Sequence, residues 1–317
     1  MTNQAAMNAK LQSVLHPAGP DAAIIADMAW VLIGGGALIF VSVMVLLALS
    51  LRGDGRPLRP MRWIAGAGIA FPVAVLSALL VWSTWRSGQL SAQTSRLPLQ
   101  ISVSAKMWWW ELRYRDPASG REIVSANEIH LPAGQDAYIG LSTSDVIHSL
   151  WIPALNGKMD AIPGRVTGLT LRAAQPGLYR GQCAEYCGEQ HARMALHVVA
   201  HTPQGFRTWL AGQATAAAAP SSALLTRGRD AFVANRCSAC HTIRGIAGDT
   251  GAQLGPDLTH VGSRLHIAAG TLRNHRGTLA GWIADPQAIK PGVRMPASAD
   301  IDGETLLALA TYLESLK

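Results

Sequence analysis

Two long apolar segments stand near the N-terminus of the chain, at residues 28–51 and 63–84, and neither contains a charged residue. About 20 apolar residues match the hydrocarbon thickness of a bilayer. Two buried core helices would be the alternative, whereas a cleaved signal peptide fits poorly because the mostly polar or mixed residues 1–27 come first. The pattern therefore predicts a transmembrane hairpin over residues 28–86.

The loop between the two apolar segments, RGDGRPLRPMR, holds four arginines against one aspartate. Short loops that are rich in Lys and Arg stay in the cytoplasm. We therefore expect the N-terminal segment, residues 1–27, and everything after about residue 87 to be extracytoplasmic.

Apolar and polar positions alternate in short runs between residues 98 and 201, such as LQISVS, AYIGLS, VTGLTLRA and ALHVVAH. Short strands separated by turns are typical of a sandwich or barrel, so a β domain is expected over residues 87–201. The stretch 202–223 includes the low-complexity run GQATAAAAPSS and predicts a flexible linker. Helical patterns around residues 224–236, 278–284 and 303–316 predict a small α domain over residues 224–317.

The net charge of +7 would suit nucleic acid, but the basic residues form no Lys/Arg-rich run, which argues against such a partner.

The four cysteines form two close pairs with none left over. One pair lies in CSACH, where Cys237, Cys240 and His241 match the attachment motif of c-type haem. A redox disulfide or half a zinc site is the alternative, although no cysteine follows Cys240. A carbonyl near Gly255 and Pro256 is expected to accept the imidazole N–H.

The sixth haem ligand must come from downstream, where Met295 in KPGVRMP is the one methionine after His241. A loop before the last helix is where a small class I cytochrome presents its methionine, and a thioether raises the haem potential. The rival ligands are His260, His266 and His275.

The other cysteine pair lies in GQCAEYCGEQHARM, where Cys183 and Cys187 stand close to His191 and Met194. A disulfide is possible but leaves the histidine and the methionine unexplained. Thiolates, imidazoles and a thioether are ligands suited to copper. Copper sites on β-sandwiches borrow a histidine from an earlier strand, and SDVIHSLWIP supplies His148. Three further histidines outside these motifs are interpreted as surface or core residues: His130, His197 and His201.

Together these motifs resemble subunit 2 of haem-copper cytochrome c oxidase over roughly residues 20–200, and DAIPGR and WWWELRY strengthen the match. The C-terminal part resembles the cytochrome c fused to some bacterial members. The resemblance implies a multidomain membrane protein with a two-helix transmembrane hairpin, a cupredoxin-like β-sandwich and a small all-α class I cytochrome c domain. It also implies the bacterial inner membrane as the location, with both termini and the redox domains on the periplasmic side.

The resemblance implies a dinuclear copper A centre whose two ions are bridged by both cysteine sulfurs. Each ion then takes one histidine, with a methionine and the backbone carbonyl of Glu185 as weak axial ligands. The Glu185 carboxylate would help to hold Mg²⁺ at the subunit 1 interface. The implied copper ligands are His148, Cys183, Glu185, Cys187, His191 and Met194.

Trp108 aligns with the tryptophan through which electrons enter the family's copper centre, whereas Met107 and Trp109 replace a common glutamine and tyrosine. The implied function is the electron-entry subunit of a terminal oxidase. Electrons from cytochrome c or an upstream respiratory complex pass through covalent haem c and copper A to subunit 1, which reduces oxygen and pumps protons. Subunit 3 and membrane lipid are further expected partners. The alternatives are a copper A nitric oxide reductase subunit and a non-redox binding module with two disulfides.

Overall fold

The computed structural model describes residues 12–53, 59–90, 97–116, 120–246 and 254–317. Contacts divide the chain into two units. One unit spans residues 20–91, and the other joins the residues up to Gly19 to those from Ala92 onward.

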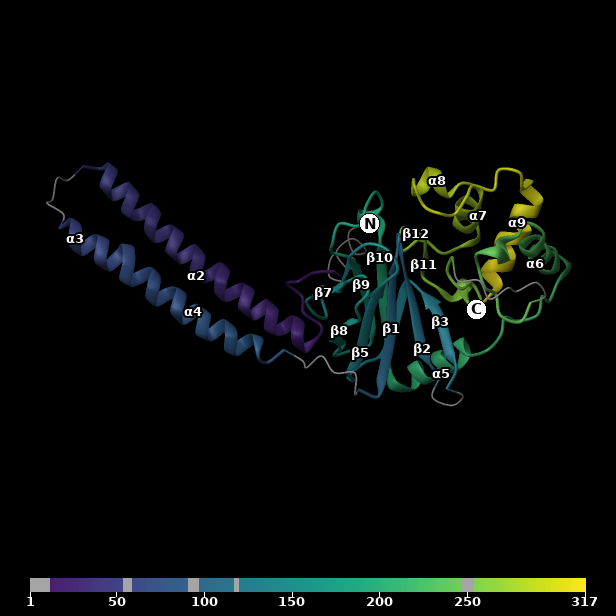
Figure 1. Cartoon of the computed structure of the whole chain (residues 1–317), viewed down its shortest axis with the longest axis horizontal. Coiled ribbons are helices and arrows are strands. Elements are labelled where there is room, and N and C mark those ends of the chain that lie inside the picture. Colours follow the sequence, from purple (N-terminus) through teal and green to yellow (C-terminus); the bar gives the residue numbers. More distant parts are fainter. Residues whose placement is uncertain (1–11, 54–58, 91–96, 117–119, 247–253) are drawn as a thin grey trace. The chain divides into compact units, whose positions relative to one another are not determined.

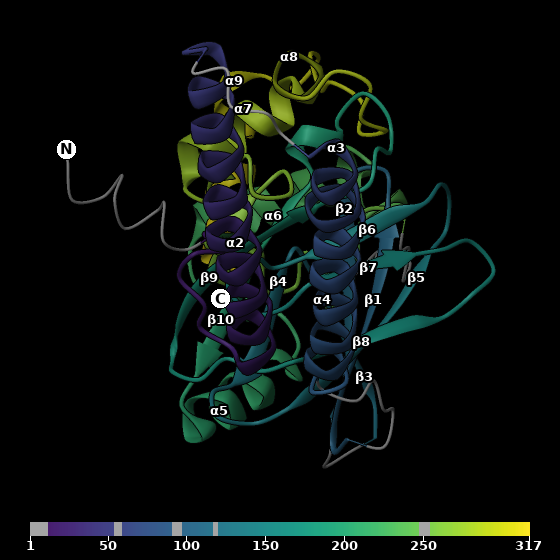
Figure 2. The same ribbon diagram turned by 90° about the vertical axis from the view of Figure 1, so that its left-hand side faces the viewer.

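The smaller unit is a pair of apolar helices that run side by side (Figures 1 and 2). The second helix contains a π-helical segment that ends at Ala70, two residues before Pro72. Proline has no backbone N–H and so cannot donate a helical hydrogen bond. Both helices are long and apolar enough to cross a membrane, with mean hydropathies of 2.6 and 2.3. Their elements are α2 (Pro20–Leu51), α3 (Pro60–Trp63), η1 (Ile64–Ala70) and α4 (Phe71–Ser87).

The first helix begins at Pro20, so its first turns include residues 20–27 of the predicted N-terminal segment, whose extracytoplasmic location stays a prediction. Pro20 suits a first helical position because its missing N–H would have no partner there. One ion pair links the two helices, since Arg86 Nη2 lies 2.8 Å from Asp27 Oδ2.

Two five-stranded sheets form the β domain, defined here as residues 97–213. The strand orders are β3-β2-β1-β5-β8 and β4-β10-β9-β6-β7. Side chains alternate as predicted, and in β1 the residues Ile101, Val103 and Ala105 are buried. The strands are β1 (Leu99–Lys106), β2 (Trp109–Arg115), β3 (Glu122–Ala126), β4 (Glu128–Pro132), β5 (Ala137–Thr143), β6 (His148–Trp151), β7 (Lys158–Ala161), β8 (Thr167–Leu171), β9 (Gly177–Cys183) and β10 (Ala195–His201).

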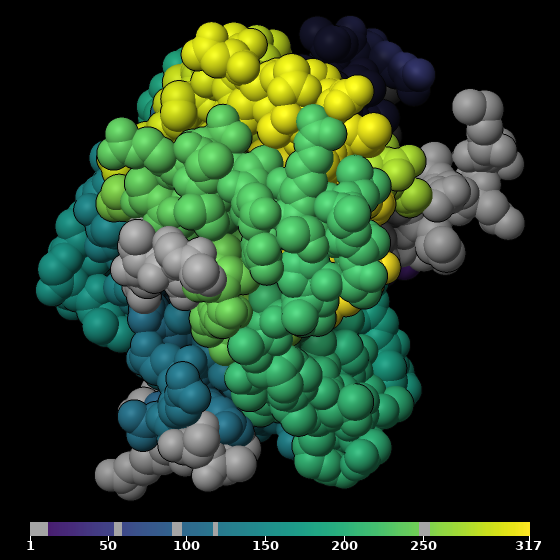
Figure 3. All heavy atoms as spheres, turned by 90° about the vertical axis from the view of Figure 1, so that its right-hand side faces the viewer, coloured from purple at the N-terminus to yellow at the C-terminus, as the bar shows by residue number. Residues whose placement is uncertain are grey.

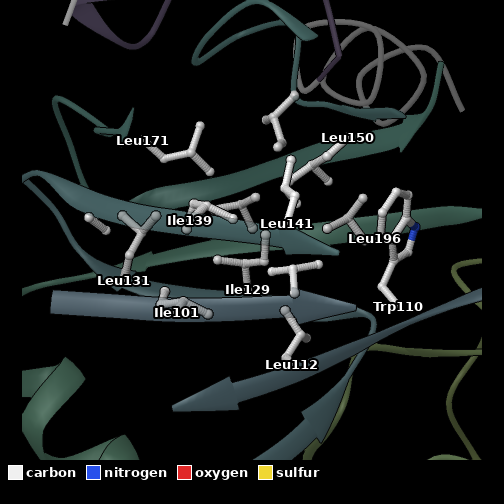
Figure 4. Packing of buried hydrophobic residues seen from close by; sticks show 14 of the residues in the cluster. Ile101, Trp110, Leu112, Ile129, Leu131, Ile139, Leu141, Leu150, Leu171 and Leu196 are labelled. Carbon is white, nitrogen blue, oxygen red and sulfur yellow. The ribbon is translucent and has the colours of Figure 1, made fainter. Parts of the chain in front are cut away.

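The core of the β domain lies between its sheets and confirms the predicted sandwich (Figure 4). Aliphatic side chains from both sheets meet there, and burying each of them fully contributes roughly 1.5–3 kcal/mol to folding. Labelled members of this core are Ile101, Leu112, Ile139 and Leu141 from the first sheet and Ile129, Leu131, Leu150 and Leu196 from the second.

The predicted linker over residues 202–223 is wrong in its first half, which forms helix α5 (Pro203–Gln213). Thr202 caps this helix by accepting a hydrogen bond from the Gly205 amide. Phe206 and Leu210 are buried in the core of the β domain. The helix therefore belongs to the β domain.

The rest of the predicted linker is also held in place. Ala217 N donates to Arg244 O over 2.9 Å, and Arg244 Nη2 donates to Gln213 O over 2.6 Å. Residues 213–217 of the stretch, all among the described residues, are therefore hydrogen-bonded to the domain that follows, so the flexible linker predicted over the whole of residues 202–223 is not supported.

The helical domain, defined here as residues 223–317, is built around α6 and α9, which pack closely against each other (Figure 1). Its atoms, coloured green to yellow, make up much of the face shown in Figure 3. A Cβ added to Gly228 would lie 2.2 Å from Ala308 O, so only glycine permits this crossing. The three predicted helices are confirmed, and a two-residue ladder, β11–β12, is added. The elements are α6 (Ala223–Ala234), η3 (Cys237–Ala239), η4 (Val261–Ser263), β11 (His266–Ile267), β12 (Leu272–Arg273), α7 (Arg276–Ala284), α8 (Pro286–Ile289) and α9 (Gly303–Ser315).

Candidate copper and haem sites

The first candidate site lies where strand β9 ends and the loop 184–194 turns back into β10. Cys183 Sγ lies 3.8 Å from Cys187 Sγ and 3.8 Å from the Nδ1 atom of His148, the first residue of β6. His191 Nδ1 lies 3.6 Å from Cys187 Sγ, on a one-turn 3₁₀ helix, η2 (His191–Arg193). The structure thus brings the two thiols and the two imidazoles together from separate elements.

The two remaining predicted ligands lie at the same place. Met194 Sδ is 3.9 Å from Cys187 Sγ, and Glu185 O is 3.2 Å from Cys183 Sγ. Both cysteines are buried thiols that form no disulfide. Six converging S, N and O donors fit copper, which prefers thiolate, thioether and imidazole ligands.

The electrostatics of the thiol pair favour a cation. A hydrogen bond from the Cys187 thiol, opposed by burial, lowers the pKa of Cys183 to about 3. The same contact, together with burial, raises the pKa of Cys187 above its ordinary value. These opposite shifts favour the thiolate at Cys183, the form that binds a metal ion.

Asp145 orients the ligand His148. Its Oδ1 lies 2.7 Å from His148 Nε2, which leaves Nδ1 facing Cys183, and its Oδ2 accepts the Met107 amide over 2.9 Å. The His148 side chain is fully buried. A carboxylate on the second nitrogen fixes the ring orientation and the tautomer of a metal-binding histidine.

We expect Asp145→Ala to lower copper affinity by about 10- to 100-fold, the usual cost of losing such an orienting partner. The measurement is competition for copper against a chelator of known strength. Asp136→Ala is the control, because Asp136 is exposed and pairs with Arg172 instead. Equal affinities in both variants would show that Asp145 does not orient the ligand.

Trp108 lies directly on the loop that carries the thiols. Its indole Nε1 donates to Cys187 O over 2.8 Å, and its ring packs on Gly188, where an added Cβ would lie 3.1 Å from Trp108 Cζ2. Gly188 has a φ of +110°, which also favours glycine. Trp110 is fully buried, as a core position should be. The indole of Trp108 is therefore in hydrogen-bonded contact with the backbone of a candidate ligand.

The carboxylate of Glu185 points away from the thiols. It lies 3.4 Å from Lys158 Nζ, and its side chain is 43% exposed. Its carbonyl faces the thiols while its carboxylate remains accessible, so its role towards Mg²⁺ stays a prediction.

The second candidate site surrounds the CSACH motif. Cys237 and Cys240 are free thiols on and directly after η3. His241 Nδ1 lies 2.8 Å from Pro256 O, as predicted, and its ring packs on Gly255, where an added Cβ would lie 2.5 Å from Cε1. The carbonyl holds the ring so that Nε2 remains available to an iron. These residues fit a covalently attached haem.

The rivals of Met295 are engaged elsewhere. Both ring nitrogens of His260 face backbone carbonyls at 3.1 Å, and His275 caps α7 by accepting the Thr278 amide. His266 stacks on His197. Met295 packs against the apolar core of the helical domain, and its assignment as the sixth ligand stays a prediction.

A third group of metal-binding residue types joins the two domains and was not predicted: Glu128, His197 and His266. The two imidazoles stack with their centroids 4.2 Å apart and their planes 11° apart. An ion in the plane of one ring would lie well outside the plane of the other, so the lone pairs do not converge. Glu128 Oε1 instead accepts the Leu265 amide over 2.6 Å. The group therefore acts as an interdomain contact.

The fold and the two donor sets define a class of protein in which a cupredoxin-like copper domain is joined to a cytochrome c domain. The family model "Cytochrome C oxidase subunit II, periplasmic domain" matches residues 110–201, and the model "Cytochrome c" matches residues 225–317. These two matches confirm the resemblance seen in the motifs and imply copper A and haem c as cofactors.

Curated relatives agree with this assignment. Cytochrome c oxidase subunit 2 of Alkalihalophilus pseudofirmus is 36% identical over 217 residues, which cover 68% of this chain and 61% of the relative. The protein of the same name from Bacillus subtilis is 31% identical over 228 residues, which cover 69% of this chain and 62% of the relative. The chain thus spans less than two thirds of either relative.

A solved structure is also similar. The periplasmic domain of cytochrome oxidase subunit II (CoxB) from Bradyrhizobium japonicum is 30% identical, with a TM-score of 0.34. The match covers 37% of this chain and 93% of that one.

Proposed function

We propose that the chain is the electron-entry subunit of a membrane-bound terminal cytochrome c oxidase. Copper A held by the loop 183–194 and haem c held by the CSACH motif would supply the two electron-carrying centres. The apolar hairpin would anchor both domains to the bacterial inner membrane. The catalytic partner would be subunit 1, where oxygen is reduced, with subunit 3 beside it and Glu185 contributing to a magnesium site between the subunits.

One observation carries this proposal: Trp108 touches both redox domains. Its indole donates to Cys187 O in the copper loop. Its ring also lies close to the helical domain, since a Cβ added to Gly292 would lie 3.7 Å from Trp108 Cη2. Gly292 stands three residues before Met295 in the sequence. The indole therefore bridges the backbone of the candidate copper loop and the segment that leads to the candidate haem ligand.

This contact changes the expected route for electrons. A tethered haem domain would dock and leave, and soluble cytochrome c could then use Trp108 directly. In the structure the helical domain already lies against Trp108, through Gly292 and the bond from Lys290 to its carbonyl, and the side chain is only partly exposed. We therefore infer that a donor delivers its electrons to haem c, and that Trp108 serves the intramolecular step to copper.

The test follows the order of reduction in the complex purified from native membrane. Rapid mixing with reduced cytochrome c should reduce haem c first and copper A second, with oxygen consumed. Trp108→Leu should leave haem reduction intact and slow copper reduction sharply, because the contact with both segments is lost. Trp109→Leu is the matched control. The Trp109 ring packs against Lys106, whose Nζ lies 5.0 Å from the ring centroid, instead of against the copper loop.

Two results would reject the proposal. Copper A reduced before haem c would show that electrons bypass the helical domain. Consumption of nitric oxide instead of oxygen by the same complex would identify the alternative, a copper A nitric oxide reductase.

A further inference from the structure

Lys290 is a buried cation at the junction of the two redox domains. It follows α8 in the helical domain, and only 2% of it is exposed. Its Nζ donates to Trp108 O over 3.1 Å, to Arg193 O over 3.0 Å and to Ala268 O over 3.4 Å. Two of these carbonyls belong to the β domain, so the ammonium group joins the domains at the backbone of Trp108.

The three contacts match what an ammonium group requires. Lysine has three N–H donors and no acceptor, and each donor here has a carbonyl partner. Burying an unpaired charge is costly, whereas hydrogen bonds to a charged group contribute more than neutral ones. The three acceptors in this cluster are backbone carbonyl oxygens and none is a carboxylate. The contact therefore depends on where the backbone lies and not on an acidic side chain.

The residues on either side of Lys290 also bind the copper loop. Gln190 Nε2 donates to Pro291 O over 2.7 Å, and Arg193 Nη1 donates to Ile289 O. Gly292 has a φ of +81°, and an added Cβ would lie 2.7 Å from Glu189 Oε2. Four consecutive residues, 289–292, therefore lie against the loop that carries the candidate copper ligands.

A separate contact holds the domains together at a different place. Glu128 accepts the amides of Leu265 and His266. Loss of the Lys290 contact should therefore leave the domains associated while loosening the segment that leads to Met295.

We propose that Lys290 is a positioning residue for interdomain electron transfer, which fixes the Met295 segment against Trp108 by binding the Trp108 and Arg193 carbonyls. This inference rests on the proposed function. It adds that the rate of electron transfer from haem c to copper depends on Lys290, although Lys290 hydrogen-bonds to none of the candidate copper or haem ligands.

The test compares three variants in the purified full-length complex after rapid reduction of haem c. Lys290→Met keeps the length of the side chain and removes the charge, and the rate constant for copper reduction should fall about tenfold or more, as loss of a charge-assisted hydrogen bond implies. Lys290→Arg should recover part of the rate, because it restores a cation. Lys317→Met is the control, since Lys317 is the other lysine of the helical domain and is exposed.

The spectra of haem c and copper A, and both midpoint potentials, should stay at their wild-type values in Lys290→Met. A wild-type rate in that variant overturns the positioning role. A slow rate accompanied by lost copper or lost methionine ligation also overturns it, because Lys290 would then be structural. If instead the wild-type protein shows no transfer from haem c to copper, the proposed function itself fails.

Discussion

Cys187→Ser is expected to abolish the mixed-valence copper signal and leave haem c intact. The Cys187 sulfur lies within 3.9 Å of three other candidate ligand atoms, in Cys183, His191 and Met194. The Cys183 sulfur likewise lies within 3.8 Å of three candidate ligand atoms, in Cys187, His148 and the Glu185 carbonyl, so the two sulfurs together contact every other donor of the site. A serine hydroxyl is harder and far less acidic than a thiol, so it replaces a bridging thiolate poorly.

Metal analysis and electron paramagnetic resonance measure this result, and the haem absorbance of the same sample reports the second centre. The reciprocal control is Cys240→Ser, which should disturb haem attachment and preserve the copper signal, because Cys240 lies on the other domain. An unchanged copper content in Cys187→Ser would contradict the copper assignment and revive the alternative of a disulfide.

The sequence was enough for those parts of the sites that are local in the chain. Five candidate copper ligands lie within twelve residues, from Cys183 to Met194, so short spacing constrains them directly. The carbonyl partner of His241 was expected near Pro256, because the motif imposes the orientation of its imidazole. Asp145, three residues before His148, is local in the same way and contacts the His148 ring.

Helix α5 was missed although its signal is present in the sequence. Phe206, Leu210 and Gln213 recur at helical spacing and are buried, and Pro203 follows the capping residue Thr202. The alanine-rich run directly after the helix suggested a linker for the whole stretch. The alanine-rich composition of the following run thus outweighed the helical periodicity of residues 203–213 in the prediction.

The interdomain contacts could not be predicted, because nothing local specifies them. Lys290 precedes a Pro-Gly turn and looks like an ordinary surface lysine in the sequence. Its burial depends on three carbonyls that come from residues up to 182 positions away. His266 and His197 likewise stack only because two domains meet. Backbone acceptors carry no residue-specific pattern, so a contact of this kind appears only in three dimensions.

Met295→Ala is expected to convert the six-coordinate haem into one with an open side. Alanine offers no ligand atom, and among the described residues the rival histidines are held by other contacts, with His260 between the Lys317 and Thr215 carbonyls. Ferric haem should therefore bind cyanide or imidazole readily, and its midpoint potential should fall because a thioether ligand raises it. The copper signal should persist.

Ligand titration and redox titration of the purified protein measure both changes, with His275→Ala as a control for an exposed capping histidine. Wild-type spectrum and potential in Met295→Ala would instead place a histidine on the iron, and the same two titrations of the His260→Ala and His266→Ala variants would then identify it.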